Sequence, residues 1–305
     1  QKQFGNQRVF DIPTSENAMT GIAIGCAINR CPVVMTHQRL DFSLLAFDQI
    51  INNAAKIFYM FNGQFTVPIT LRLIVGKGWG QGPTHAQSLQ SLFAHIPGLK
   101  VVMPSNPNDA KKMLIQSIED PNPVIYIEHR WLHDQKGHVE KGFKSKKIGK
   151  ANLLMKGNDI TIVSNSFMTT EALIAAKILR SNGIYADLID LCSIKPLDEK
   201  AILKSVKKTR RLIVLDDGHD FLSIASEIIS IVTIKQFDIL KISPKKITMP
   251  NFPVPTGYSL TKNFYPGHKD VIKYCQNIFD KNIKYDNFSN KNFHDVPHVR
   301  FKGPF

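Results

Sequence analysis

Short apolar runs rich in β-branched residues alternate with segments of helical periodicity along most of the chain. Strands that alternate with helices favour a mainly parallel sheet, because each crossover between parallel strands needs a connecting helix. We therefore predict an α/β fold with helices on both faces of a parallel sheet. The expected strands are residues 32–36, 67–75, 99–103, 124–128, 159–164, 186–191 and 211–216. The expected helices start at residue 16 and then cover 44–61, 89–92, 106–118, 170–181, 196–207, 221–232 and 270–279.

The alternation stops once, in a polar and basic stretch at residues 133–150 that contains Gly137, Gly142 and Gly149. Such a composition is typical of a linker between domains. A length of 305 residues with 43% hydrophobic content is enough for two cores. We predict a first domain at residues 1–135, a linker at 136–150 and a second domain at 151–280. Residues 281–305 lack periodicity and are expected to form a loose tail, or an arm that orders on a partner.

Composition excludes several classes of function. The formal charge is +14, but the lysines form only short clusters with no aromatic-interleaved basic stripe, so a solvated surface or an acidic partner subunit is favoured over nucleic acid. No run of 18 apolar residues exists, and no membrane span is expected. The four cysteines have no CxxC or zinc-ligand spacing, which fits a reducing, cytoplasmic location without a disulfide framework or metal site. The abrupt start without Met predicts a truncated or processed N-terminus.

The segment FDIPTSENAMTGIAIGCA, residues 10–27, carries one carboxylate in an otherwise small and apolar stretch. Ser15 is placed to cap a helix, and Glu16 then lies in its first turn. Close packing of the small residues would desolvate Glu16 and favour its protonated form, which suits proton transfer. The alternative is that Glu16 only complements the helix dipole.

A glycine-rich loop at residues 76–82 suggests a phosphate-binding turn but lacks the spacing of one. The chain lacks the dinucleotide-binding pattern G-x-G-x-x-G and the P-loop pattern. It also lacks the nucleophile-elbow pattern G-x-S-x-G. The loop more plausibly permits a close approach of the backbone to a ligand or a second chain. His85 follows it, at the sheet edge where open α/β folds place their chemistry. On spacing alone, a surface or capping role for His85 is equally open.

His37 and Gln38 follow the first expected strand and reach a similar sheet edge. They either line a polar site or are turn residues. Phe42, shortly after, is more often a core residue than a ring-stacking partner of a ligand. His129, His133 and His138 do not have the spacing of a metal site.

Beyond these single residues, the chain resembles a known family over about residues 8–280. It is similar to the beta subunits of the thiamine-diphosphate-dependent 2-oxo acid dehydrogenases, the first component of the pyruvate and branched-chain enzymes, which are grouped with the central and C-terminal regions of transketolase. The motifs that carry the likeness are PTSE (13–16), TGIAIG (20–25), DF (41–42), DQIIN (48–52), THAQS (84–88), HIPGLKVVMP (95–104), DAK (109–111), PVIYIE (123–128), DL (190–191) and KPLD (195–198).

The resemblance implies a pyrimidine-binding module followed by a transketolase-type C-terminal domain. It implies that Glu16 bonds the pyrimidine nitrogen of thiamine diphosphate and so favours the ring tautomer that activates the cofactor. It aligns His85 with an active-site histidine that relays protons or stabilises the acyl adduct, and Phe42 with the aromatic residue that packs on the pyrimidine. His37 and Gln38 are further candidates for cofactor binding, in a segment that differs from the commonest family form.

The family holds the diphosphate and magnesium with a Gly-Asp-Gly and a downstream Asn, and this chain has no Gly-Asp-Gly. The resemblance therefore implies that the chain carries only the pyrimidine half of the cofactor site, with no metal ligand of its own. An alpha-type subunit would supply the other half in a two-plus-two heterotetramer.

The implied reaction is decarboxylation of a 2-oxo acid of the pyruvate type, followed by acyl transfer to a lipoyl group on an acyltransferase core. One alternative is a transketolase-like or acyloin-forming enzyme. The other is an inactive or truncated scaffold subunit, because an expected strand and helix before Arg8 are missing and residues 216–226 depart from the family's glycine-rich turn.

Overall fold

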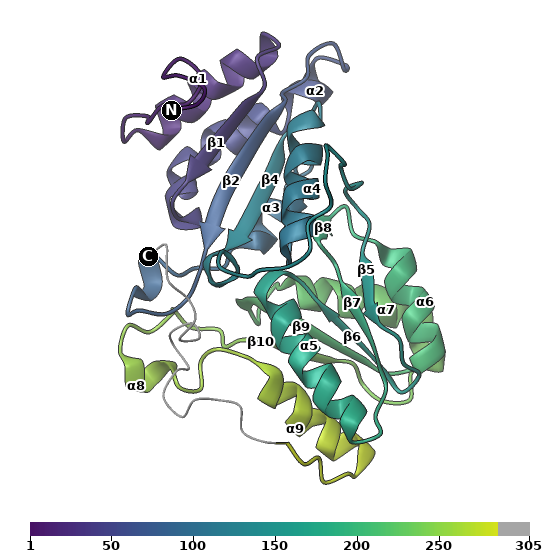
Figure 1. The fold of residues 1–305 in the computed structure, drawn as a ribbon. Coiled ribbons are helices and arrows are strands. Elements are labelled where there is room, and N and C mark those ends of the chain that lie inside the picture. The colour runs from purple at the N-terminus through teal and green to yellow at the C-terminus, as the bar shows by residue number, and fades with distance from the viewer. Residues whose placement is uncertain (286–305) are drawn as a thin grey trace.

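The computed structural model describes residues 1–285 and contains two five-stranded sheets with helices packed on them (Figure 1). The first sheet has the order β1 (Val33–His37), β2 (Ile69–Val75), β4 (Val124–His129), β3 (Lys100–Val102) and β8 (Ser193–Lys195). The second has the order β10 (Lys245–Met249), β9 (Leu212–His219), β6 (Ile160–Ser164), β7 (Ala186–Asp190) and β5 (Asn152–Met155). All pairings are parallel except those of β8 and β5, which are antiparallel edge strands. The predicted α/β class is confirmed.

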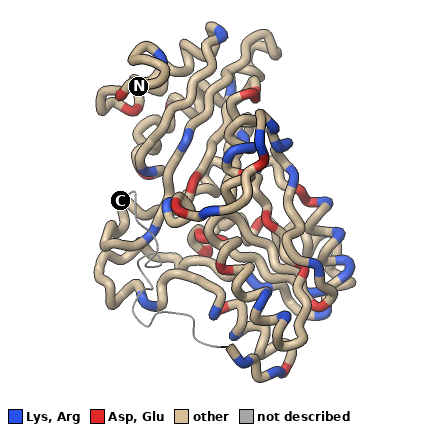
Figure 2. The backbone as a smooth tube through the Cα atoms, in the orientation of Figure 1, with Lys and Arg blue, Asp and Glu red and all other residues tan. Residues whose placement is uncertain are grey.

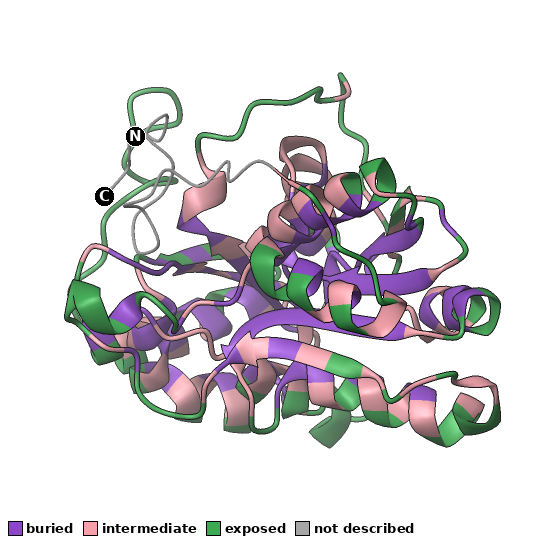
Figure 3. Cartoon of the chain, turned by 90° about the horizontal axis from the view of Figure 1, so that it is seen from below, coloured by how far each residue is buried: buried purple, intermediate pink, exposed green. Residues whose placement is uncertain are grey.

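The helices cover both faces of the second sheet and flank the first (Figures 1 and 3). On the second sheet, α5 and α9 pack on one face and α6 and α7 on the other. The helices of the first half are α1 (Glu16–Ile28), α2 (Ile57–Met60), α3 (Gln90–His95) and α4 (Pro107–Glu119). Those of the second half are α5 (Ser166–Ser181), α6 (Glu199–Thr209), α7 (Ile224–Gln236), α8 (Tyr258–Thr261) and α9 (His268–Phe279). No helix within residues 1–285 is long and apolar enough to cross a membrane.

The helix predicted at residues 44–61 is wrong as a single α-helix. The chain instead forms a 3₁₀ segment η1 (Leu40–Ala46), a π-helix η2 (Asp48–Ala54) and then α2. The amide of Ala55 donates to the carbonyl of Ile50 at 3.0 Å, so the turn is five residues wide. This wider turn buries Ile50 and Ala55 together against the first core, which an apolar pattern of ordinary helical period cannot indicate.

Residues 133–150 contain no helix or strand, as predicted for that stretch. Three strands were not predicted, namely β5, β8 and β10, and the remaining boundaries move by a few residues. Most of the predicted tail, residues 286–305, lies outside the described residues. The short and polar β8 matters most, because it belongs to the second half of the sequence and pairs with β3 of the first sheet.

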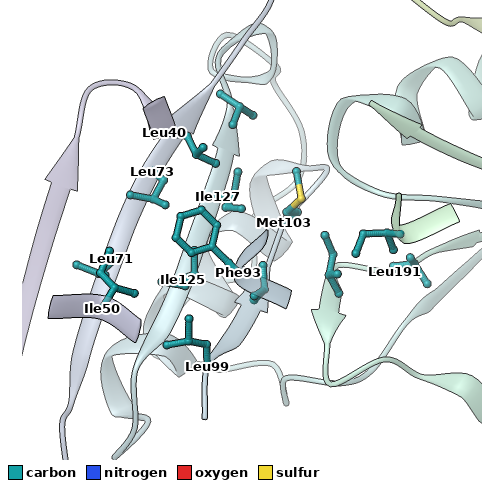
Figure 4. Close-up of a cluster of buried hydrophobic side chains, with 14 of the residues drawn as sticks. Leu40, Ile50, Leu71, Leu73, Phe93, Leu99, Met103, Ile125, Ile127 and Leu191 are labelled. Atoms are coloured by element: carbon teal, nitrogen blue, oxygen red, sulfur yellow. The ribbon is translucent and has the colours of Figure 1, made fainter. Parts of the chain in front are cut away.

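The segment that leads into β8 also joins the two cores. Leu191 leaves β7 and packs in one buried cluster with Met103, Leu99 and Phe93 of the first half (Figure 4). At the next residue the carbonyl of Cys192 accepts a hydrogen bond from the amide of Met103 at 2.8 Å. The two halves therefore share one apolar core instead of meeting through a solvated linker.

A buried polar cluster reinforces this junction. Asp109, Asp190 and Cys192 bring three potential ligand atoms within 4.8 Å of one another. The Lys146 ammonium lies 3.2 Å from both Asp109 and Cys192, and Asn152 donates to Asp109 at 2.6 Å. Burial raises the pKa of Asp109, but the charge of Lys146 and the hydrogen bonds from Asn106, Asn152 and Lys146 together outweigh it, so the net pKa is lowered. Lys146 thus balances the charge of Asp109, whereas burial raises the pKa values of Asp190 and Cys192 and favours their neutral forms. Other Lys and Arg residues are spread over much of the chain (Figure 2).

Gly98 is the position at which the backbone of the first half is most tightly constrained. Its φ is +96°, and a Cβ there would lie 1.9 Å from the carbonyl oxygen of Ala55. We expect Gly98→Ala to lower the free energy of unfolding by about 3 kcal/mol, since left-handed backbone strain and overpacking each contribute about 1–3 kcal/mol. Gly142→Ala is the matched control, because Gly142 has φ +81° and open space around it. If Gly98→Ala and Gly142→Ala lower the free energy of unfolding by the same amount in urea titrations, the predicted clash at Gly98 is wrong.

Candidate functional site

The carboxyl ends of the parallel strands β1, β2, β4 and β3 of the first sheet lie at one edge, where open α/β sheets place their sites. β1 ends at His37 and continues into η1, which holds Phe42. β2 ends at Val75 and continues into the glycine-rich loop and a short 3₁₀ turn, η3 (Gly82–Thr84), which is followed by His85. These two connections bring residues that are far apart in the sequence to the same edge.

Glu16 is the first residue of α1, as the sequence predicts, but two details differ. Ser15 occupies the N-cap position without a side-chain hydrogen bond to the helix. Glu16 is only partly buried in this chain, so the close packing expected around it is incomplete here. Nearby His37 is 5% exposed, and burial lowers its pKa while the charge of Glu16 acts in the opposite direction. His37 is therefore neutral at pH 7 and electrostatically coupled to Glu16.

Phe42 and His85 are in direct contact. Their ring centroids lie 5.5 Å apart with the planes nearly perpendicular, at 87°. The Nδ1 atom of His85 is 2.9 Å from the Thr84 hydroxyl, which orients the imidazole. The His85 side chain is otherwise exposed, so it is available to a ligand or a second chain.

Asp41 and Gln87 support this contact and were not predicted as site residues. The amide of Gln87 donates to Asp41 Oδ1 at 2.7 Å and so joins η1 to the segment after His85. Burial raises the pKa of Asp41, and the Gln87 hydrogen bond opposes that rise. The two residues are 46 positions apart, and no local pattern in the sequence indicates that they meet.

Gln38 is not part of this arrangement. It is exposed, and its backbone carbonyl accepts a hydrogen bond from the Arg39 guanidinium at 2.7 Å. Gln81 is instead the glutamine at the sheet edge. With its amide oriented to satisfy both ends, it accepts from Arg39 at 2.9 Å and from Arg130 at 3.1 Å, and it donates to the carbonyl of His85 at 3.2 Å.

The residues at this edge offer a carboxylate, two imidazoles and an aromatic wall. His37 Nε2 is buried without a hydrogen-bond partner, which leaves it able to bond a bound group. Such a set fits a flat, nitrogen-containing ring that exchanges protons. The glycine-rich dinucleotide and P-loop phosphate-binding patterns do not occur in the chain.

The fold and this edge define a two-domain chain of the transketolase type. Residues 1–134 match the family model described as the transketolase pyrimidine binding domain, and residues 149–271 match that of the transketolase C-terminal domain. Among solved structures, the inactive beta4 tetramer of a split-gene transketolase matches with a TM-score of 0.75 at 20% identity, covering 90% of this chain and 85% of that one.

Curated relatives place the chain more narrowly. It is 41% identical to the beta subunit of acetoin:2,6-dichlorophenolindophenol oxidoreductase from Bacillus subtilis, over 89% of this chain and 79% of the relative. The corresponding subunit from Cupriavidus necator is 40% identical, over 87% and 78%. The beta subunit of the pyruvate dehydrogenase E1 component from Rickettsia felis is 35% identical, over 91% and 85%. The chain belongs to this family of dehydrogenase-complex beta subunits.

A second group of polar residues lies where the two halves meet. Gln90 of α3 donates to Asp216 at 2.6 Å and to Asp217 at 3.1 Å, and all three side chains are buried. Burial and the neighbouring charge of Asp216 raise the pKa of Asp217 to about 7, while Lys77 opposes the rise. Burial holds the pKa of His129 well below 6.5, so its 4.0 Å approach to Asp217 is not an ion pair.

Asp217 makes the stability of the chain depend on pH. Its pKa is higher in the folded chain than its ordinary value of 3.8. The folded state then binds more protons between about pH 4 and pH 7, and stability falls as pH rises through that window. The difference between the folded pKa of about 7 and the ordinary value of 3.8 corresponds to roughly 4 kcal/mol of stability. We expect Asp217→Asn to remove most of this decline and to stabilise the chain above pH 7, as measured by urea unfolding at several pH values.

Asp220→Asn serves as the control for that measurement. Burial raises the pKa of Asp220, but hydrogen bonds from Lys246 and Thr248 outweigh it and lower the pKa. The stabilisation that ionised Asp220 contributes is lost only as pH falls below the ordinary pKa of an aspartate. The Asp220→Asn variant should therefore retain the decline in stability above pH 5. A wild-type chain with the same stability at pH 5 and pH 8 would contradict the prediction for Asp217.

Proposed function

We propose that this chain is the pyrimidine-binding half of a thiamine-diphosphate-dependent 2-oxo acid dehydrogenase and acts together with an alpha-type subunit. Two observations in a pyrimidine-binding-type domain support the proposal: the rings of Phe42 and His85 are in contact, and the charge of Glu16 acts on the buried His37. Thiamine diphosphate, when bound, supplies the carbon nucleophile that a 2-oxo acid needs to lose its carboxylate. The chain's own residues then bind, orient and exchange protons.

Each residue has a distinct proposed role. Glu16 bonds the ring nitrogen of the pyrimidine and shares a proton with it, and Phe42 packs against the ring. His85, held by Thr84 and Phe42, moves protons at the substrate side. His37 is neutral and has a buried nitrogen without a hydrogen-bond partner, so it can bond the ring without adding a positive charge near Glu16. Gln38 remains a candidate only for contacts with the cofactor or partner from its exposed position.

The missing half of the site points to a partner chain. Without a Gly-Asp-Gly motif, this chain has no evident means of holding the diphosphate and magnesium, and we assign both to the alpha-type subunit of a heterotetramer. Large apolar side chains are exposed on α1, α2 and the segment before α1, which is typical of a surface that another chain covers. They are Phe10, Ile22, Phe58, Tyr59 and Phe61. A lipoyl-bearing acyltransferase core would accept the acyl group. Four free thiols suit a cytoplasmic location.

An acyloin such as acetoin is the second candidate substrate. The acetoin relatives are 41% and 40% identical to this chain, whereas the pyruvate dehydrogenase relatives are 35–37% identical. Both substrate classes present a ketone carbon to the same nucleophile and differ in the bond that is then broken. An inactive scaffold subunit is the remaining alternative.

Cofactor binding tests the half-site directly. We expect isothermal titration of thiamine diphosphate with magnesium to give no heat of binding with this chain alone and clear binding after it is mixed with an alpha-type partner. Glu16→Gln should reduce the turnover of the mixture about 10²–10⁴-fold, the range for loss of a general acid or base. Glu119→Gln, an exposed change at the end of α4, is the control. Tight binding by the isolated chain would refute the division of the site.

The substrate class is decided by a panel of acceptors. The assembled mixture is assayed with pyruvate and with acetoin, each in the presence of either a lipoyl domain or 2,6-dichlorophenolindophenol. Turnover of pyruvate that needs the lipoyl domain supports the 2-oxo acid dehydrogenase. Turnover of acetoin alone supports the second candidate. If neither substrate reacts although the partner assembles normally, the scaffold interpretation holds.

A further inference from the structure

Lys77, the second residue of the glycine-rich loop, is a buried cation enclosed by aromatic rings. Lys77 as a whole is only 8% exposed. Its ammonium lies 5.0 Å from the ring centroid of Trp131, 4.8 Å from that of Phe167 and 4.8 Å from that of Tyr265. The first ring follows β4, whereas the other two belong to the second half of the chain. The loop of one half is thus attached to the other half by cation–π contacts.

Carboxylates of the second half complete this environment. The charge of Lys77 acts to lower the pKa of both Asp217 and Glu171. Glu171 in turn accepts hydrogen bonds from the His268 amide at 2.9 Å and approaches its Nδ1 at 2.6 Å, so its position is fixed by α9. The Lys77 charge is therefore balanced by groups that come from α5 and from the end of β9.

The far end of the same loop is also held by the second half. Gly82 has φ +66°, and a Cβ there would lie 2.3 Å from the hydroxyl oxygen of Thr256. Gly80 likewise faces Thr256, because a Cβ added at Gly80 would lie 3.6 Å from the carbonyl oxygen of Thr256. His85 follows within three residues of Gly82. Both ends of the loop that leads to His85 are thus set by the second half.

We propose that Lys77 is a positioning residue, which holds the loop at residues 76–82 so that His85 stays against Phe42. This inference rests on the proposed function for its effect on turnover, but the geometry it describes belongs to the chain itself. It gives the second half a specific task at the site.

The first test measures the loop without any assay of activity. Hydrogen–deuterium exchange is followed in peptides covering residues 76–89 for the full chain, Lys77→Met, Lys77→Arg and the exposed control Lys204→Met. Methionine keeps the apolar stem and removes the charge. We expect at least tenfold faster exchange of the loop in Lys77→Met and near-normal exchange in Lys77→Arg, because arginine also binds over aromatic faces. Peptides from β6 should not change in any variant.

The second test uses the complex assembled with an alpha-type subunit. We expect Lys77→Met to lower kcat about 10-fold to 100-fold with KM nearly unchanged, and Lys77→Arg to restore much of it. Unchanged exchange in Lys77→Met, or an arginine variant no better than methionine, would overturn the proposal. If Lys77→Met does not fold, Tyr265→Leu removes one ring of the enclosure and answers the same question. If the wild-type complex has no turnover, the proposed function fails, while the exchange data still decide the role of Lys77.

Discussion

The antiparallel pairing of β3 with β8 is the constraint on which the arrangement of the two halves depends. The chain leaves the second sheet at the end of β7, and three residues later it forms an edge strand of the first sheet. The same crossing buries Leu191 in the shared core and Asp190 in the polar cluster with Ser105, at 2.6 Å. Because hydrogen bonds, apolar packing and charge all act within one short segment, the halves have little freedom to rotate against each other.

A fixed orientation lets the second half act at the edge of the first. Burying a cation is costly unless partners compensate for the lost water, and here three rings and two carboxylates surround Lys77. Such an arrangement is tolerated only where the surrounding elements do not move. The glycine-rich loop then has a defined path even though its own residues have little conformational preference.

The candidate site combines a carboxylate, two imidazoles and an aromatic ring that differ in how far they are buried. Glu16 is only partly buried in this chain, whereas His37 and Asp41 are buried. Exposed apolar residues flank Glu16 in the sequence, Phe10 and Ile12 before α1 and Ile22 on it, and a chain that covered them would also desolvate this carboxylate. The pKa of such a group is then a property of the assembly more than of the chain.

The sequence by itself determined the α/β class and most strands and helices, and it singled out Glu16, Phe42 and His85 as candidate site residues. These follow from local periodicity, from turn chemistry and from motifs whose residues are adjacent. Only the tertiary structure decided that β8 crosses to the first sheet, that a π-helix replaces part of the helix after residue 40, and that Asp41 meets Gln87. It also decided that Lys77 reaches Phe167 and Tyr265. Contacts between residues 46 to nearly 190 positions apart leave no local periodicity in the sequence, because they depend on how completed elements pack.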